Sequence, residues 1–495
     1  MATRTLLRGG LVLDGARNNA ERADVLVQGD SIADMLAPGT SVGDAQVMDV
    51  SNRLLIPGLV NAHTHAQTHL GKGTADRWTL EILLNGYPWS GKRTVEHHYL
   101  SAALGAAEMV RKGCTMAYDM FAEFPTPSVE GVGAVAKAYR DVGMRACIAP
   151  MMADRSFYQA IPGLLDALPP DLRQAAEGVR LAPYQASLEA CRKIVTGWSV
   201  DRDQVRVGLG PTIPHHCSDE FLTGCRDLAK EFGLGIQMHV AESKVQAVVG
   251  PKRYGTTLVG HLDRLGMLGP HFTAAHGIWL DDEDMKRLGG KGASVAHNPG
   301  SNLKLGSGIA AMRKLLSAGV NVAVGTDGTL SSDNCNMFEA MRLACFVSRV
   351  HSFDIQAWID SREALTAATE SGAKALGFGG RLGRIARGYL ADIVVLDLGA
   401  LHFVPLNNPL NQVVHAEDGT AVESVMIGGR LVLDHGRFIA FDMANVVQRV
   451  EGVMAGLREA GAETRKIGAA LEPIVNQFCL GLALSDYPVH RHVGV

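Results

Sequence analysis

Short apolar runs rich in Val, Ile and Ala alternate with longer amphipathic stretches through the middle of the chain, from residue 58 to about residue 380. The short runs have the length of buried strands, and the longer ones have the period of helices that pack on a sheet. Eight runs have strand character: 58–65, 113–120, 145–152, 205–213, 234–241, 272–279, 292–298 and 319–327. Eight such βα units over roughly 320 residues predict an α/β fold of the (β/α)₈ TIM-barrel type rather than an open doubly wound sheet.

Helices that would cover these strands are expected at residues 99–112, 131–142 and 334–350, and a helical extension at 443–470. The segment 153–200 is longer than an ordinary βα connection, which suggests a lid.

Both ends of the chain instead show short β-branched runs broken by Gly-Asp, Asp-Gly or Gly-Gly, which is the pattern of hairpins. These runs are 5–14, 24–36, 47–56, 391–398, 411–415 and 422–434. We expect the two ends to pair in one small, discontinuous β-sandwich. The predicted domains are a composite sandwich of residues 1–57 and 381–442, a barrel of residues 58–380, and a C-terminal helical extension and tail of residues 443–495.

Composition excludes several classes of protein. Hydrophobic residues make up 47% of the 495 residues and charged residues 20%, which is the balance of a folded globular protein. The net charge is −4 and the basic residues are scattered, so we expect a small-molecule partner and no nucleic acid. No long apolar window and no signal-peptide pattern occur, so we expect no membrane partner and a cytoplasmic location.

The cysteines show no Cys-x-x-Cys pair and no dense spacing, which argues against both a disulfide framework and a zinc ribbon. We expect buried free thiols at Cys114, Cys147, Cys191, Cys217, Cys225, Cys335, Cys345 and Cys479.

Histidine and aspartate residues recur where the predicted strands end. His63 and His65 are two residues apart, so both side chains point to one face. His239, His276 and Asp327 end three further strands, and in a barrel those ends meet at one mouth. Alone, a His-x-His pair is as ordinary at a strand end as at a metal site. Together, three imidazoles and a carboxylate suit one divalent ion, with Zn²⁺ favoured and Fe²⁺ possible, and an open position for water.

Five motifs follow one another along the chain: PGLVNAHTH at 57–65, HVAES at 239–243, AHGIWL at 275–280, SVAHNPGSNLKLGSG at 294–308 and GTDG at 325–328. As an ordered set they resemble the amidohydrolase superfamily, in particular its metal-dependent aminohydrolase branch of cytosine, guanine and S-adenosylhomocysteine deaminases and triazine hydrolases. A sixth stretch, GRIARGYLADIVVLDL at 383–398, is similar to the return strand of the same family.

The resemblance implies a role for each matching residue. It assigns His63, His65, His239 and Asp327 to one metal, and Asp327, Glu242 and His276 to catalysis. Asp327 would take a proton from the attacking water, and Glu242 would carry it to the leaving nitrogen. His276 would orient the water or polarise the scissile group. The alternatives are an exposed loop carboxylate for Glu242 and an ordinary core histidine for His276.

Substrate contacts are expected from polar and aromatic residues near the strand ends, since pockets combine apolar walls with a few polar groups. The candidates are Trp89, Phe121, Thr212, His216, His297 and Asn302. Core packing, or a structural hydrogen bond for His297, is the alternative reading of these residues. The chain departs from the S-adenosylhomocysteine deaminase pattern at Thr212, where a histidine is usual, and at Lys72-Gly73, where Arg-Gly is usual. The first departure argues against a nucleoside substrate.

The predicted function is metal-dependent hydrolysis of a C–N bond other than a peptide bond, with hydrolytic deamination of an aromatic heterocycle favoured. Hydrolysis of an amide, carbamate, urea or alkylamino substituent is the first alternative. A non-enzymatic binding scaffold is the second, and it would require lost metal ligands. The fourth predicted strand offers no lysine to bridge two metals, so a mononuclear site is expected. The resemblance also implies a homodimer.

Overall fold

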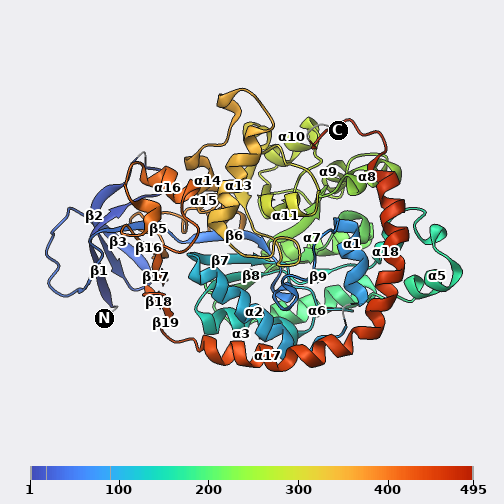
Figure 1. Cartoon of the computed structure of the whole chain (residues 1–495), viewed down its shortest axis with the longest axis horizontal. Coiled ribbons are helices and arrows are strands. Elements are labelled where there is room, and N and C mark those ends of the chain that lie inside the picture. The colour runs from blue at the N-terminus through green and yellow to red at the C-terminus, as the bar shows by residue number, and fades with distance from the viewer. Residues whose placement is uncertain (1–2, 18, 90, 493–495) are drawn as a thin grey trace.

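Strands from both ends of the chain pair in one sheet at one side of the molecule (Figure 1). The computed structural model describes residues 3–17, 19–89 and 91–492. The nine strands are β1 (Arg4–Val12), β2 (Glu21–Gln28), β3 (Ser31–Leu36), β4 (Gln46–Asp49), β5 (Arg53–Pro57), β16 (Ile393–Asp397), β17 (Val422–Ile427), β18 (Arg430–Asp434) and β19 (Arg437–Phe438). β5 joins the two ends, because it runs parallel to β1 and antiparallel to β16. The sandwich form of this unit stays a prediction.

One predicted end strand is wrong. Residues 411–415 lie in a helix, α16 (Pro409–His415), and not in a strand. Asn408 caps the helix by accepting from the amide of Asn411, and proline stands at the first helical position. These are the preferred residues for a helix start, and the run of Val413 and Val414 is buried on one side of the helix.

The middle of the chain forms parallel strands, and each of the eight predicted runs contains at least one of them. One four-stranded sheet holds β6 (Leu59–Thr64), β7 (Cys114–Asp119), β8 (Arg145–Ile148) and β10 (Val205–Val207). A second holds β12 (Ile236–Val240), β13 (Phe272–His276), β14 (Ser294–His297) and β15 (Asn321–Val324), and β9 (Met151–Met152) pairs with β11 (Gly210–Pro211).

Backbone contacts join these sheets at both margins. Leu209 and Ile236 form a parallel bridge between the segment after β10 and the start of β12. At the other margin the amide of Asp327, just after β15, donates to the carbonyl of His63 in β6 at 2.9 Å. The carboxyl ends of β6 and β15 therefore lie side by side.

Helices follow most of the strands, including those predicted at α2 (Val95–Arg111), α3 (Val129–Val142) and α13 (Met337–Arg349). Segment 153–200 contains α4 (Phe157–Ala160), α5 (Pro170–Glu177) and α6 (Tyr184–Thr196); its role as a lid stays a prediction. The other helices are α1 (Leu80–Gly86), α7 (Asp219–Phe232), α8 (Lys244–Tyr254), α9 (Leu258–Arg264), α10 (Asp282–Gly290), α11 (Pro299–Lys304), α12 (Met312–Ser317), α14 (Ser361–Ala367) and α15 (Glu370–Ala375), with short 3₁₀ turns η1 (Ala66–Gly71), η2 (Tyr87–Trp89), η3 (Leu165–Ala167), η4 (Pro214–His216), η5 (Ile355–Ala357) and η6 (Leu401–Phe403).

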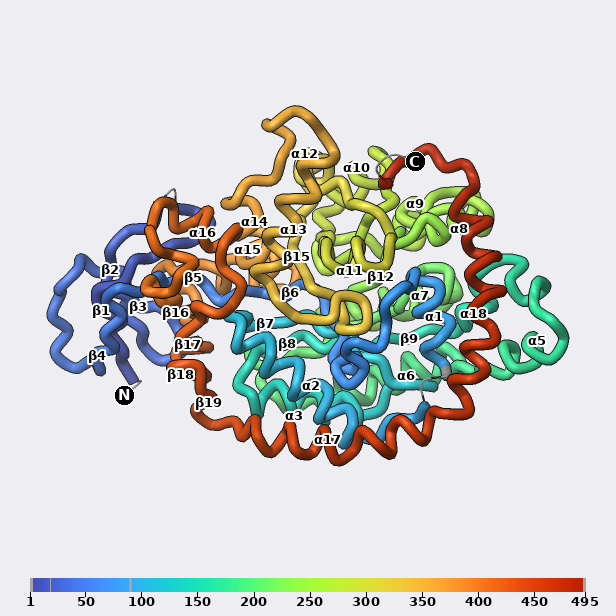
Figure 2. The backbone as a smooth tube through the Cα atoms, viewed as in Figure 1, coloured from blue at the N-terminus to red at the C-terminus, as the bar shows by residue number. Residues whose placement is uncertain are grey.

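The C-terminal helices wrap around the outside of the molecule. α17 (Met443–Ala460) runs beside α2, and α18 (Ala462–Ala483) passes α1 and α8 before the chain returns toward α10 (Figure 2). Leu471 and Val475 of α18 share a buried apolar cluster with Tyr158 and Val249. The extension is therefore packed into the fold.

All eight cysteines are free and buried, as expected. Among the described helices, none combines the length and the hydropathy needed to cross a membrane.

Candidate metal and catalytic site

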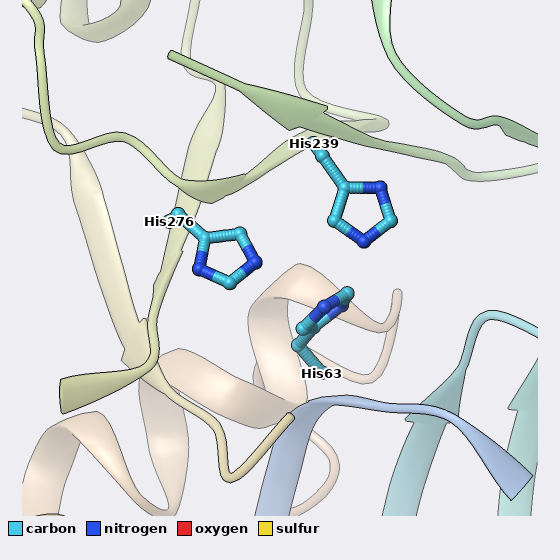
Figure 3. Close-up of side chains that lie close together, drawn as sticks. All are labelled: His63, His239 and His276. Atoms are coloured by element: carbon cyan, nitrogen blue, oxygen red, sulfur yellow. The ribbon is translucent and has the colours of Figure 1, made fainter. Parts of the chain in front are cut away.

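Four histidines and an aspartate meet where the central strands end. His63 belongs to β6 and His65 follows it directly, His239 belongs to β12, His276 ends β13, and Asp327 follows β15. Figure 3 shows the rings of His63, His239 and His276 pointing toward one shared space. Ligand atoms of His63, His239 and His276 lie within 4.8 Å of one another, as do those of His63, His65 and Asp327. The predicted metal ligands are thus brought together.

The Nδ1 atom of each of these imidazoles faces an oxygen acceptor. The pairs are His63 with Gln237 Oε1 at 2.8 Å, His65 with Met120 O at 2.7 Å, His239 with Thr212 O at 2.8 Å, and His276 with Asn302 Oδ1 at 2.9 Å. Carbonyl oxygens cannot donate, so the Nδ1 atoms of His63, His65 and His239 carry the proton, whereas Nδ1 of His276 also lies 3.4 Å from the side-chain amide nitrogen of Asn298. The orientation of the Gln237 amide is fixed because its nitrogen donates to the carbonyl of Ala62 at 2.8 Å. The Nε2 atoms of His63, His65 and His239 are therefore left as lone-pair donors.

The inward Nε2 atoms fit a cation and little else. Those of His65 and His239 lie 3.3 Å apart, and with both protons on Nδ1 neither can donate to the other. The Nε2 atom of His63 is buried and has no hydrogen-bond partner among the described residues. Asp327 Oδ1 lies 3.2 Å from His65 Nε2 and 3.4 Å from His63 Nε2. Three nitrogens and one oxygen gathered in a buried site are a donor set for Zn²⁺ or a similar divalent ion.

Asp327 is held in a conformation that turns its carboxylate into the site. Its φ is +63°, a region that non-glycine residues seldom occupy and that is found at functional sites. Ser301 and Ser331 donate to its Oδ2 at 2.6 and 2.9 Å. The amide of Gly328 donates to its Oδ1 at 2.7 Å, so both carboxylate oxygens accept hydrogen bonds, which favour the charged form. The group is an anion at neutral pH.

A glycine permits the close approach of β15 to β6 beside this carboxylate. A Cβ atom at Gly325 would lie 2.7 Å from the amide nitrogen of His63 and 2.5 Å from Asn298 Oδ1. Any side chain at this position would separate the two strand ends.

Glu242 is buried beside His276, with Oε1 3.6 Å from His276 Nε2. Burial raises its pKa well above the usual range, and the charges of Asp327 and Glu81 add to the shift. The amide of Glu242 donates to Gln246 Oε1 at 3.0 Å, which ties the residue to α8. The exposed-loop alternative for Glu242 does not hold.

His276 also has a left-handed backbone, with φ of +70°. Burial lowers its pKa to about 4, so the ring is neutral at pH 7. In the described part of the chain its buried Nε2 atom has no hydrogen-bond partner, and it lies between Glu242 and Asp327, 3.9 Å from Asp327 Oδ2. A neutral ring here can exchange a hydrogen bond with water through this nitrogen.

The predicted substrate contacts have different surroundings. Asn302 and Thr212 hold His276 and His239 through the bonds given above, so both contribute an oxygen to the histidine arrangement. Phe121 is fully buried in the main core, with its ring edge-on to His98 at 4.9 Å between centroids. For Trp89 the backbone lies in η2, and its side chain lies outside the described residues.

His216 and His297 are buried imidazoles. Burial lowers the pKa of each to about 3. His297 has no hydrogen-bond partner on either ring nitrogen within the described structure, so its structural-bond alternative finds no support. His216 packs against His215 and Phe157, with ring centroids 4.9 and 6.3 Å away. Substrate contact by these residues stays a prediction.

Several residues that shape the site were not singled out from the sequence. Gln237 stands two positions before His239, and period-two alternation along the strand places both on one face. Ser301 lies inside the recognised SVAHNPGSNLKLGSG motif. Glu81 is a buried carboxylate of α1 that accepts from Ser243 at 2.6 Å. No pattern marks Glu81, because its burial depends on helices distant in sequence.

The model of the Amidohydrolase family matches residues 54–432. The chain belongs to this family. It is 34% identical over 407 residues to the 5-methylthioadenosine/S-adenosylhomocysteine deaminase of Syntrophobacter fumaroxidans, covering 82% of this chain and 86% of the relative. The recognised resemblance and the predicted class of metal-dependent hydrolase are thereby confirmed.

Solved structures of similar proteins carry the same fold. A zinc-bound adenosine deaminase from Xanthomonas campestris aligns with a TM-score of 0.82 and 27% identity over 92% of this chain and 99% of that one. An atrazine chlorohydrolase from Arthrobacter aurescens, also with zinc, aligns with a TM-score of 0.81 and 22% identity over 91% of this chain and 100% of that one. The chain therefore has the α/β fold of its family.

Proposed function

We propose that this amidohydrolase removes an amino group from an aromatic heterocycle by hydrolysis, with one divalent metal held by His63, His65, His239 and Asp327. The observation that carries the proposal is the set of inward Nε2 atoms around the Asp327 carboxylate, with Glu242 beside them. Zn²⁺ is the favoured ion, since both structural relatives described above contain it.

The metal would supply a nucleophile at neutral pH by lowering the pKa of water. Asp327, an anion in contact with the histidines, accepts the proton that the attacking water loses. Glu242 holds a proton readily because its pKa is raised, so it is suited to protonate the leaving nitrogen. His276 faces both carboxylates through its Nε2 atom and orients the water or the ring nitrogen of the substrate. Water and the aminated ring become ammonia and the hydroxylated (oxo) ring.

The first substrates to test are adenine derivatives, because the relatives include deaminases of that class. Thr212 contributes its backbone carbonyl to His239, and its side chain replaces the usual histidine of the nucleoside deaminases. Free bases and 5′-substituted nucleosides therefore belong in one panel. Activity on nucleosides would show that Thr212 does not exclude a sugar.

We also propose that the two four-stranded sheets close into a (β/α)₈ barrel spanning residues 58–380, with residues 1–57 and 381–442 as the second domain and 443–495 as an extension. The contacts Leu209–Ile236 and Asp327–His63 support closure. A homodimer, a cytoplasmic location and the absence of a nucleic-acid partner stay predictions. Light scattering on the purified protein tests the dimer.

Metal analysis combined with a product assay tests the function. Purified protein should contain about one equivalent of metal, lose activity in chelator and regain it with Zn²⁺. Adenosine, 5′-methylthioadenosine, adenine, guanine, cytosine and aminotriazines are scored for released ammonia. Alkylaminotriazines, amides, carbamates and ureas are scored for released amine. Amine without ammonia would favour the alternative reaction, and neither product from metal-loaded protein would overturn the assignment.

A further inference from the structure

A buried arginine near the C-terminal end contacts the loop that follows His276. The side chain of Arg491 is only 9% exposed. Its Nε donates to the carbonyl of Ile278 and its Nη2 to the carbonyl of Leu280, both at 2.7 Å. These charge-assisted bonds are short, and they fix two carbonyls two and four residues after His276.

The same loop is held on its other side by the end of β12. The amides of Ile278 and Trp279 donate to the carbonyl of Ala241 at 3.2 and 2.9 Å, and Ala241 immediately precedes Glu242. Residues 277–280 thus lie between the arginine and the segment that carries Glu242. A displacement of this loop would move His276 relative to Glu242, whose atoms are 3.6 Å apart.

The backbone of Arg491 contacts a second loop of the site. Its carbonyl accepts from the amide of Ile309 at 2.9 Å. The neighbouring Ser307 donates its amide to the carbonyl of Asn302 at 2.9 Å and accepts from the Trp279 indole at 2.7 Å. Asn302 is the residue that accepts from His276 Nδ1. One residue of the tail therefore joins the loop after His276 to the loop that follows its hydrogen-bond partner.

Arginine is suited to this place because its planar, rigid fork reaches two separate carbonyls, which the point charge of lysine cannot hold in the same geometry. The residue lies beyond the part of the chain that the family model matches, residues 54–432. Figure 2 shows the route: the chain leaves α18 and returns toward α10, where the C-terminal end lies.

We infer that Arg491 is a positioning residue. It fixes the loop after His276 relative to the loop after Asn302, so that His276 faces Glu242. This inference rests on the proposed function, because it assigns the tail a part in the same reaction. The C-terminal extension then contributes to the geometry of the catalytic site.

The test compares full-length Arg491→Met and Arg491→Lys with wild type. With Met, kcat should fall about 10- to 100-fold, the effect of misplacing a reacting group, while KM and bound metal change little. Lys should recover part of kcat. Hydrogen exchange of the amides in residues 277–281 should be faster in Arg491→Met. Arg458→Met, at an exposed position of α17, is the matched control and should behave as wild type.

Three results would overturn the inference: unchanged exchange in residues 277–281, a KM effect with kcat preserved, or an equal loss in Arg458→Met. If Arg491→Met does not fold, Arg491→Lys must show a lower kcat than wild type and faster exchange in residues 277–281 for the inference to stand. Hydrogen exchange needs no substrate. A wild-type protein without hydrolase activity would therefore refute the proposed function while exchange still reports on the Arg491 contact.

Discussion

The Nε2 atoms of His65 and His239 lie 3.3 Å apart, and each ring gives its only proton to a backbone carbonyl on the far side. Two lone pairs at this distance repel each other in a buried site. Asp327 Oδ1, 3.2 Å from His65 Nε2, adds a negative charge to the same space. A cation at this point would turn each of these unfavourable contacts into a bond.

Metal removal should therefore lower the stability of the protein as well as its activity. A ligand present at 1,000 times its Kd stabilises the folded state by about 4 kcal/mol. We expect chelated protein to melt at a lower temperature than zinc-loaded protein, and one equivalent of Zn²⁺ to restore the melting temperature. His239→Ala is the control variant, in which Zn²⁺ should have little effect. Identical zinc-induced shifts in His239→Ala and wild type would contradict the assigned ligands.

Gln237 should control metal affinity without touching the metal. Its Oε1 accepts from His63 Nδ1 at 2.8 Å, which fixes both the proton and the plane of that ring. Loss of such an acceptor weakens metal binding by about 10- to 100-fold. Gln237→Leu should show this loss in a zinc competition titration. Gln237→Glu keeps an acceptor oxygen and should bind more tightly than the Leu variant; equal affinities in the two variants would refute the role.

The sequence predicts the candidate metal ligands that the structure brings together, but not the groups that orient them. The sequence identifies His63, His239 and Asp327 because each ends an apolar run, and strand ends converge in this class of fold. The acceptors at Met120 and Thr212 are backbone carbonyls, which any residue supplies, so their identity carries no signal. Arg491 and Glu81 are functional candidates only through contacts between segments far apart in the chain.

The wrong strand at 411–415 has a local cause. Asn411–His415 has two adjacent β-branched residues and is too short for a period to separate a strand from a helical turn. The decisive feature is the Asn408-Pro409 start just before it. Among the substrate candidates, Phe121 illustrates a second limit. Sequence position places it after β7, but its direction into the core is set by packing.

Glu242→Gln should abolish turnover while leaving the metal bound. The carboxyl lies 3.6 Å from His276 Nε2, and an amide of the same shape cannot transfer a proton. Loss of a general acid–base group costs about 10²- to 10⁴-fold in rate, so kcat should fall by that factor. Glu220→Gln, at an exposed position in α7, is the matched control. Turnover by Glu242→Gln within a few-fold of the control would remove Glu242 from the mechanism.

His216 should make the fold sensitive to acid. Burial lowers its pKa to about 3, whereas an unfolded chain protonates histidine near 6.5. The stabilisation linked to this depressed pKa is complete above pH 6.5 and is lost as pH falls toward 3, because only the unfolded chain takes up the proton in that window. Each such histidine contributes a slope of about 1.4 kcal/mol per pH unit to the free energy of unfolding.

His216→Gln removes a titrating group, so its free energy of unfolding should fall less steeply than that of wild type between pH 6 and about pH 4. Urea unfolding of chelated protein at several pH values measures the slope without a contribution from metal release. His271→Gln, at an exposed position, is the control for the exchange of a histidine for a glutamine. A His216→Gln slope equal to that of wild type would mean that the His216 ring is protonated in the folded protein, and the buried neutral imidazole described above would be wrong.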